Sequence, residues 1–172
     1  MTILAPTSLS KWLVNSFSVI LYPHKSGADL MRLLERPSRR FDRFTKDLIV
    51  LGKVPFVAQA SRRKLVGVTA RDLGMKRMSI PRGEIYSEAI RQGLLVCNKQ
   101  VGPELYLVRP SQKGVIASEP MILGSDLQLL FEIKERKQPI REGEKSEWEL
   151  STDAGCSTIS FPNTRLWLFE VA

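Results

Sequence analysis

The residues whose types and spacing best fit a chemical reaction are Arg82, Glu84, Tyr86 and Glu88, in the middle of the chain. Glu84 and Glu88 are spaced so that a helix would place both carboxylates on one face. Arg82, Glu84 and Tyr86 together would also suffice for a small nuclease-like toxin that needs no histidine. An ordinary solvated helix face explains the same spacing, and we take it as the main interpretation.

The other reactive side chains form no recognised motif. His24 is the only histidine of the sequence, and it has no carboxylate partner nearby in the chain, so no histidine dyad is predicted. Cys97 and Cys156 are too few for a disulfide framework or a four-ligand zinc site. The sequence also lacks a phosphate-binding loop, a dinucleotide fingerprint and a nucleophile elbow. We therefore expect a non-catalytic protein with reduced thiols, no metal site and no cofactor.

The segment that would position the acidic pair is predicted to be a helix over residues 81–92. Pro81 suits the first turn, where its missing N–H costs nothing, and Ser79 precedes it as a candidate cap. Gly93 follows as the end of the helix. This central helix has basic elements before it and predicted strands after it.

This part of the chain resembles a group of small uncharacterised bacterial proteins. The resemblance rests on ARDLGM, EIYSEAIRQGL and CNKQVGPELYL, then an Arg-Pro-Ser-Gln turn and IASEPMI. The shared pattern is Leu-Gly, a Tyr-bearing helix ending in Gly-Leu, a Cys, Val-Gly-Pro and an apolar strand ending in Glu-Pro. It covers about residues 70–134, and Asn98 stands where the pattern has a proline. The resemblance implies a bacterial protein, but it implies no activity and transfers no catalytic residue.

Length and composition predict a globular protein. A chain of 172 residues fits one domain, or one domain with an appendage, and 43% hydrophobic residues exclude intrinsic disorder. No apolar run is long enough to span a membrane. Residues 12–22 are apolar, but they lack the basic start and the small-residue cleavage site of a signal peptide. We expect a cytoplasmic protein that does not enter a membrane.

Positive charge is concentrated in the first half of the chain. Residues 1–86 carry a net charge of +10 and residues 87–172 carry −2, which together give the +8 of the whole chain. This asymmetry predicts one positive face that contacts a polyanion. The alternative is that the cations only keep the protein soluble.

The candidate anion-binding residues fall into three groups. A predicted helix over residues 38–52 has a Phe/Leu face, and its cations lie on the opposite face. A basic cluster precedes a predicted buried strand at 65–68, and a third pair lies in the turn before the central helix. The candidates are Arg39, Arg40, Arg43, Lys46, Arg62, Arg63, Lys64, Lys76 and Arg77.

The first third of the chain is predicted to be helical. Leu9, Leu13, Phe17 and Ile20 recur at helical spacing, which predicts a first helix that ends before Pro23. A second helix is expected between residues 26 and 37, with a capping-box variant at its start. The junction between it and the helix over residues 38–52 is short enough for a helix-turn-helix, although nothing in the residues fixes the crossing angle of the two helices.

The rest of the chain is predicted to be mainly strands. Residues 115–122 and 127–134 are expected to form an antiparallel hairpin, and residues 164–171 a strand in the interior of the sheet. The predicted fold class is therefore α+β, with a helical N-terminal third followed by a mainly antiparallel sheet on which the central helix packs. Residues 1–60 would form a helical basic region and residues 61–172 an α+β sheet domain, or both one continuous domain.

These observations favour a non-catalytic bacterial or phage-type binding protein. Its basic N-terminal half would contact nucleic acid or another polyanion, mainly through phosphates and with little sequence preference. One alternative is a protein-interaction module, such as an inhibitor or an assembly subunit, whose cations meet an acidic protein surface. The other is the nuclease-like toxin built from Arg82, Glu84 and Tyr86.

Overall fold

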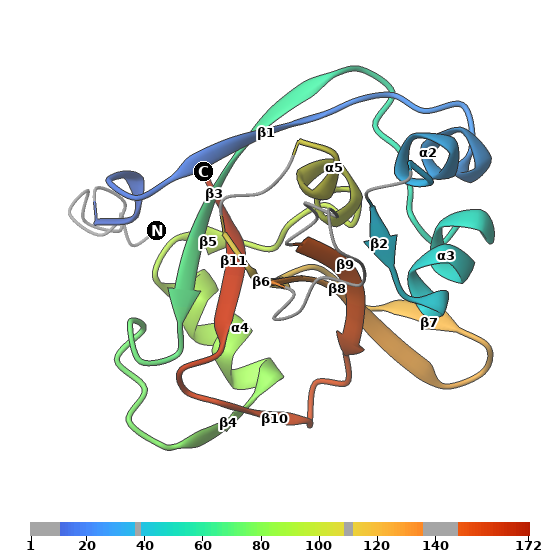
Figure 1. Ribbon diagram of the computed structural model, residues 1–172. Helices are drawn as coiled ribbons and strands as arrows, with labels where there is room; N and C mark the ends of the chain where they lie inside the picture. Colours follow the sequence, from blue (N-terminus) through green and yellow to red (C-terminus); the bar gives the residue numbers. More distant parts are fainter. Residues whose placement is uncertain (1–10, 37–38, 109–111, 136–147) are drawn as a thin grey trace, which may run out of the picture.

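The computed structural model describes residues 11–36, 39–108, 112–135 and 148–172. Within these ranges, nine strands form one curled mixed sheet with the shape of a half-barrel (Figure 1). The strands are, in spatial order, β1 (Phe17–Leu21), β3 (Ser61–Thr69), β11 (Leu166–Val171), β6 (Gly114–Ile116), β8 (Leu127–Glu135), β9 (Trp148–Ala154) and β2 (Arg40–Phe41), with β5 (Leu94–Leu95) also on β11 and β7 (Met121–Leu123) also on β8. Separately, β4 (Ser79–Pro81) pairs with β10 (Ser160–Pro162).

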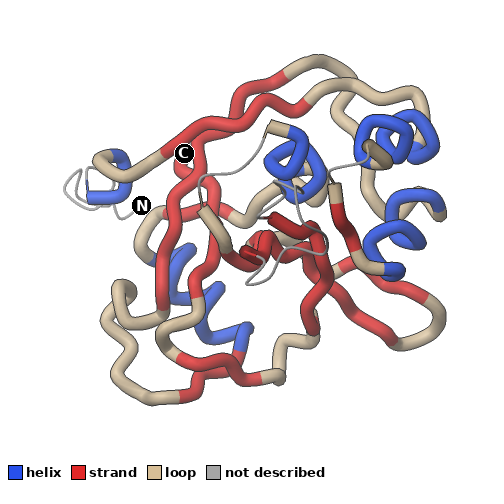
Figure 2. The backbone as a smooth tube through the Cα atoms, viewed as in Figure 1, coloured by secondary structure: helices blue, strands red, loops and turns tan. Residues whose placement is uncertain are grey.

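Helices cover both faces of the curled sheet (Figure 2). They are α2 (Gly27–Leu34), α3 (Arg43–Val50), α4 (Arg82–Arg91) and α5 (Val101–Leu107). A first core, between the sheet and α2, α3 and α5, includes Leu21, Leu30, Leu48, Leu105, Phe131, Leu150 and Leu168. A second core, between the sheet and α4, includes Trp12, Val66, Ile85, Tyr86, Leu130, Trp167 and Phe169. The first core joins residues of both predicted regions, 1–60 and 61–172.

Strand β11 lies in the interior of the sheet. It pairs with β3 and β5 in antiparallel fashion and with β6 in parallel. Trp167, Leu168 and Phe169 are all fully buried, with Leu168 in the first core and the two aromatic residues in the second. Successive strand residues point to opposite faces, so a run of apolar residues marks a strand covered on both sides. The predicted interior position of this strand is confirmed.

The predicted fold class is wrong, because the first third of the chain is not a run of helices. Phe17–Leu21 forms strand β1, and its pairing with β3 begins with Phe17 opposite Leu65. Val19 and Leu21 enter the first core as alternate residues, so a period of two determines this segment. The sheet is also mixed, since β6 is parallel to β11 and β2 is parallel to β9.

The predicted helix over residues 38–52 is shorter than expected. It begins at Arg43, because the side chain of Asp42 accepts a hydrogen bond from the backbone N–H of Thr45 at 2.7 Å. Arg40 belongs to strand β2 instead, and Arg39 precedes that strand, while Ser38 lies outside the described residues. The second helix is confirmed as α2, whose predicted cap, Ser26, accepts a hydrogen bond from Asp29 N.

Helix α4 confirms the predicted central helix, although Pro81 is its N-cap and Ser79 belongs to β4. Helix α5 was not predicted, because a Gly-Pro pair usually interrupts an apolar segment. Pro103 lies in the first helical turn, where no N–H is needed. Gly102 packs so closely on Phe131 that a Cβ atom at that position would lie 2.7 Å from the Phe131 Cβ.

The predicted hairpin is confirmed only where β7 pairs with β8, around a turn in which Gly124 has a φ of 69°. The predicted strand 115–122 is divided into β6 and β7. In the described ranges, none of the helices has the length and apolar character needed to span a bilayer.

The central position of β11 predicts a large difference between two phenylalanine substitutions. Phe169→Ala should lower the free energy of unfolding by about 3–5 kcal/mol, because it leaves a cavity in the second core. Phe44→Ala is the matched control, since Phe44 is 43% exposed on α3; it should cost less than about 1 kcal/mol. Urea unfolding followed by tryptophan fluorescence measures both values. Equal losses would contradict the central placement of β11.

Candidate functional site

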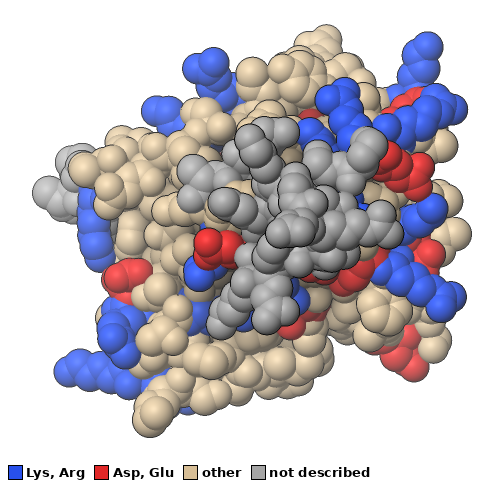
Figure 3. Space-filling model, in the orientation of Figure 1, with Lys and Arg blue, Asp and Glu red and all other residues tan. Residues whose placement is uncertain are grey.

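The cations of helix α3 are close to acidic groups. Arg43 Nε lies 3.7 Å from Asp47 Oδ2, and Lys46 Nζ lies 3.0 Å from Glu35 Oε1. In Figure 3, blue and red atoms accordingly lie side by side over α2 and α3, at the right of the molecule. The positive charge of this predicted binding stripe is thus largely balanced by the protein itself.

Arg39 and Arg40 are held by α5. The Arg39 guanidinium donates to the Leu107 carbonyl oxygen at 2.8 Å and lies over the ring of Tyr106. The backbone N–H of Arg40 donates to the hydroxyl of the same tyrosine at 2.6 Å. These contacts connect the segment before α3 with α5.

The basic run Arg62–Lys64 lies within strand β3 and not before it, so its side chains alternate between the two faces of the sheet. Arg63 points to one face, where its Nη1 atom lies 3.0 Å from Glu170 Oε1. Arg62 and Lys64 share the other face and are exposed. The structure therefore separates the middle cation from its two neighbours.

The last two predicted residues, Lys76 and Arg77, lie in the loop between β3 and β4. Arg77 forms an ion pair with Glu84, whereas Lys76 is exposed. Figure 1 shows this loop at the lower left and α3 at the right. The structure thus does not bring the cations of α3 and of this loop together.

Five exposed cations lie on β3, in the loop after it or beside that loop, and we call them the β3 rim. They are Lys11, Arg62, Lys64, Arg71 and Lys76. None of them pairs with a carboxylate of the described residues, although Lys11 Nζ lies 3.2 Å from the backbone oxygen of Asp72. Figure 3 shows blue atoms along the left edge, from β1 and β3 down to the loop before β4. Sequence reasoning missed Lys11 and Arg71, because neither belongs to a basic run.

The residues of the predicted acidic helix face do not converge on one accessible site. Arg82 and Tyr86 are buried, with 7% and 6% exposure, and the Tyr86 hydroxyl donates to the Ser118 carbonyl oxygen. Burial raises the pKa of Tyr86 above its ordinary value. Glu84 is paired with Arg77 at the surface, and hydrogen bonds from Arg91 and then Gln92 lower the pKa of Glu88.

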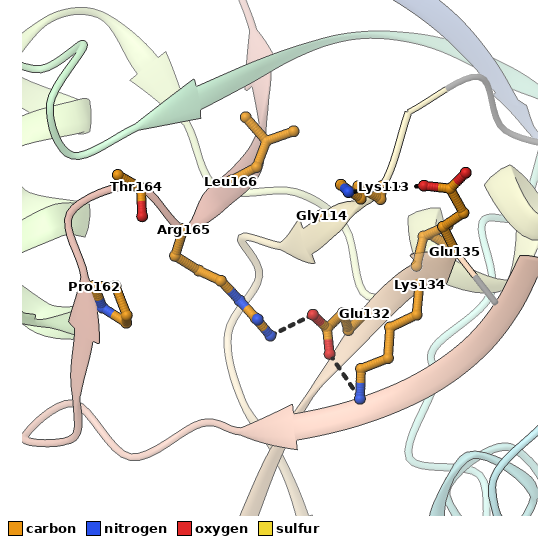
Figure 4. A pocket seen from close by; sticks show the side chains of 10 residues that line it. Lys113, Gly114, Glu132, Lys134, Glu135, Pro162, Thr164, Arg165 and Leu166 are labelled. Carbon is orange, nitrogen blue, oxygen red and sulfur yellow. Dashed lines mark hydrogen bonds and ion pairs between the residues drawn. The ribbon is translucent and has the colours of Figure 1, made fainter. Parts of the chain in front are cut away.

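A charged pocket of about 510 Å³ lies between β6, β8 and the turn before β11 (Figure 4). Arg165 reaches Glu132 and also lies 2.5 Å from Asp153 Oδ2. On the other side, Lys134 Nζ lies 3.0 Å from Glu132 Oε2. Burial raises the pKa of Glu132, while the charges of Arg165 and Lys134 act in the opposite direction.

The charges in this pocket are balanced by one another. A further ion pair lies outside the group around Arg165: Lys113 Nζ is 3.7 Å from Glu135 Oε2. Arg165 joins carboxylates from two neighbouring strands, β8 and β9, to the turn before β11. We therefore interpret the cluster as an ion-pair network that holds one end of the half-barrel together.

His24 has a carboxylate partner, which corrects the expectation of a solitary histidine. Its Nε2 atom lies 2.6 Å from Glu104 Oε1, and a carboxylate accepts, so this nitrogen carries the proton. The same oxygen accepts from Tyr22 N and Gln100 Nε2, and Gln100 Oε1 accepts from Val57 N. The cluster attaches two loops to α5. Sequence inspection missed it because the partners are far apart in the chain.

The two cysteines have opposite environments. Cys97 is buried, which raises the pKa of its thiol, and its Sγ donates to the Leu168 carbonyl oxygen. Cys156 is partly exposed, and hydrogen bonding by Thr158 lowers the pKa of its thiol, with the nearby Arg82 charge acting in the same direction. In the described parts of the chain, no three His, Cys, Asp or Glu side chains form a group that could hold a metal ion.

Comparison with known proteins adds no further information on this site. No protein-family model matches the chain, and no curated protein and no solved structure matches it either.

The thiol environments predict that only Cys156 reacts in the folded protein. With an aromatic disulfide reagent at neutral pH, the native chain should release one equivalent of thiolate, and denaturant should expose the second. Cys156→Ser should remove the native reaction, and Cys97→Ser should retain it. Thr158→Val should slow the reaction at neutral pH, because the thiol pKa then rises. Reaction of both thiols without denaturant would contradict the burial of Cys97.

The three hydrogen bonds to Glu104 predict a strong effect on stability. Glu104→Ala should lower the free energy of unfolding by about 2–4 kcal/mol, because the backbone N–H of Tyr22, His24 Nε2 and the buried Gln100 Nε2 lose their shared acceptor. The matched control is Glu84→Ala at an exposed ion pair, which should cost less than about 1 kcal/mol. Chemical denaturation measures both. A loss at Glu104 no larger than the control would show that the cluster contributes little.

Proposed function

We propose that this chain is a non-catalytic binding protein that contacts nucleic acid or another polyanion through the β3 rim. The observation that carries the proposal is that the rim cations are exposed and have no carboxylate partner among the described residues. Exposed cations without a partner keep their full attraction for phosphate groups. We also propose that the protein is of bacterial or phage type and acts in the cytoplasm.

The distribution of ion pairs explains why the rim is favoured over helix α3. A phosphate that binds Arg43 or Lys46 must compete with Asp47 or Glu35, which lie beside them. Arg62 and Lys64 have no such competitor, and as alternate residues of β3 they are about 7 Å apart on one face. Two such cations can contact successive anionic groups of an extended polymer.

An acidic protein surface is the second candidate partner, since the same cations would also attract carboxylates. The two partners differ in how binding depends on salt and on the polymer. Phosphate polymers release condensed counterions when they bind, so their affinity falls steeply as the salt concentration rises. A protein surface has no comparable condensed layer.

The rim predicts which cations control this salt dependence. Replacing Arg62 and Lys64 together by Gln should lower the slope of log affinity against log salt by about one unit for each lost phosphate contact. The matched control replaces Arg43 and Lys46 by Gln and should change the slope less. Fluorescence anisotropy with labelled DNA and RNA measures the slopes, and thermal unfolding checks the fold.

Two results would contradict the proposal. One is no detectable binding of DNA, RNA or polyphosphate by the wild type at low salt. The other is an equal effect of the rim variant and the α3 variant, because the β3 rim would then have no special role. After the first result, an acidic protein surface would become the better candidate partner for the same cations.

A further inference from the structure

A second pocket, of about 630 Å³, opens at the lower end of the β3 rim. One wall is the loop between β3 and β4, which supplies Arg71, Lys76 and Met78. The other wall is the end of β10, which supplies Pro162, and the turn after it, which supplies Asn163. Two of the five rim cations therefore lie at the pocket itself.

Backbone hydrogen bonds hold the two walls together. Arg71 N donates to the Asn163 carbonyl oxygen at 3.1 Å, and Asn163 N donates to the Met78 carbonyl oxygen at 2.9 Å. The pairing of β4 with β10 continues this connection. The loop is fixed at its start as well, because the Asp72 carboxylate accepts from both the backbone N–H and the hydroxyl of Thr69. The pocket is thus formed before any ligand binds.

The side chain of Asn163 indicates what the pocket binds. Asn163 is 9% exposed and lines the pocket, yet its side-chain amide makes no hydrogen bond with any described residue. The amide atoms remain accessible to solvent, and because the protein does not use them, they are available to a ligand that enters the pocket. An amide offers a donor and an acceptor side by side, which matches the edge of a nucleobase.

The other lining groups fit the remaining parts of a nucleotide. Met75, Met78 and Pro162 supply an apolar surface for the flat face of a base, and Met78 is 86% exposed. A flexible thioether side chain adapts to such a surface. Arg71 and Lys76 have no carboxylate partner in the described ranges, so they are free to bind the phosphate.

We propose that this pocket holds one nucleotide of a single-stranded nucleic acid, with its phosphate at Arg71 and Lys76 and its base edge at Asn163. The inference rests on the proposed polyanion binding and adds the class of polyanion. In a duplex the base is paired and stacked, so it cannot enter the pocket without leaving the helix. A single strand has free base edges and faces, which is why proteins read such strands in this way.

The test compares polymers of similar charge that differ in their bases. The probes are single-stranded DNA, single-stranded RNA, a DNA duplex and inorganic polyphosphate, each measured at low salt by competition in fluorescence anisotropy. We expect the wild type to prefer single strands to both the duplex and polyphosphate. The DNA and RNA probes show whether the pocket distinguishes the two sugars.

Two substitutions remove the proposed base contacts without changing charge. Asn163→Ala and Met78→Ala should each weaken the binding of single strands by about five- to tenfold and leave polyphosphate binding unchanged. Ile122→Ala, an exposed apolar residue on β7, is the control and should change neither. If Asn163→Ala does not fold, Met78→Ala still decides the question, because its side chain is mostly exposed.

The outcomes separate this inference from the proposed function. Equal affinity for single strands, duplex and polyphosphate, with no effect of either substitution, would overturn the nucleotide pocket and leave polyanion binding at the rim. Loss of polyphosphate binding in Asn163→Ala or Met78→Ala would also overturn it, since neither residue should contact phosphate. No binding of any of the polymers by the wild type would overturn both.

Discussion

The burial of β11 on both faces is the constraint on which the rest of the structure depends. Leu168 belongs to the core under α2, α3 and α5, whereas Trp167 and Phe169 belong to the core under α4. Strands β3, β6 and β8 also send residues into both cores, and β11 pairs with two of them, β3 and β6, in the interior of the sheet. The two pockets lie beside this strand because the turn that precedes it, around Thr164, lines both of them.

The parts of the fold that follow from local pattern were predictable. The caps of α2, the Gly-terminated helix α4 and the apolar strand β11 each carry their signal within a few neighbouring residues. Strand β1 was mistaken for a helix, because Phe17 and Ile20 also fit a helical period and only the pairing with β3 decides between the two. Helix α5 was missed because a proline interrupts a helix at most positions. Pro103 lies in the first turn of α5, where a proline is tolerated.

The candidate site was less predictable than the fold, because it depends on which charges meet in space. The sequence places Arg62, Arg63 and Lys64 in one cluster, yet the strand sends Arg63 to Glu170 on the opposite face. Likewise Lys46 meets Glu35 across two helices. Asn163 carried no signal at all, since an unpaired amide is recognised only when its surroundings are known. Net charge suggested a polyanion as the partner to propose, whereas only the ion pairs of the folded chain show which cations remain available for it.

The long-range register of β11 also concerns how the protein is made. Glu170 lies opposite Leu65, so β3 leaves the ribosome long before its neighbour in the sheet exists. Until then, the edges of β3 and β6 that will face β11 have unpaired N–H and C=O groups, which can pair with strands of other chains. Strands that close late in this way fold slowly and expose apolar surface for longer. Synthesis of this protein should therefore be sensitive to the supply of chaperones that bind nascent chains.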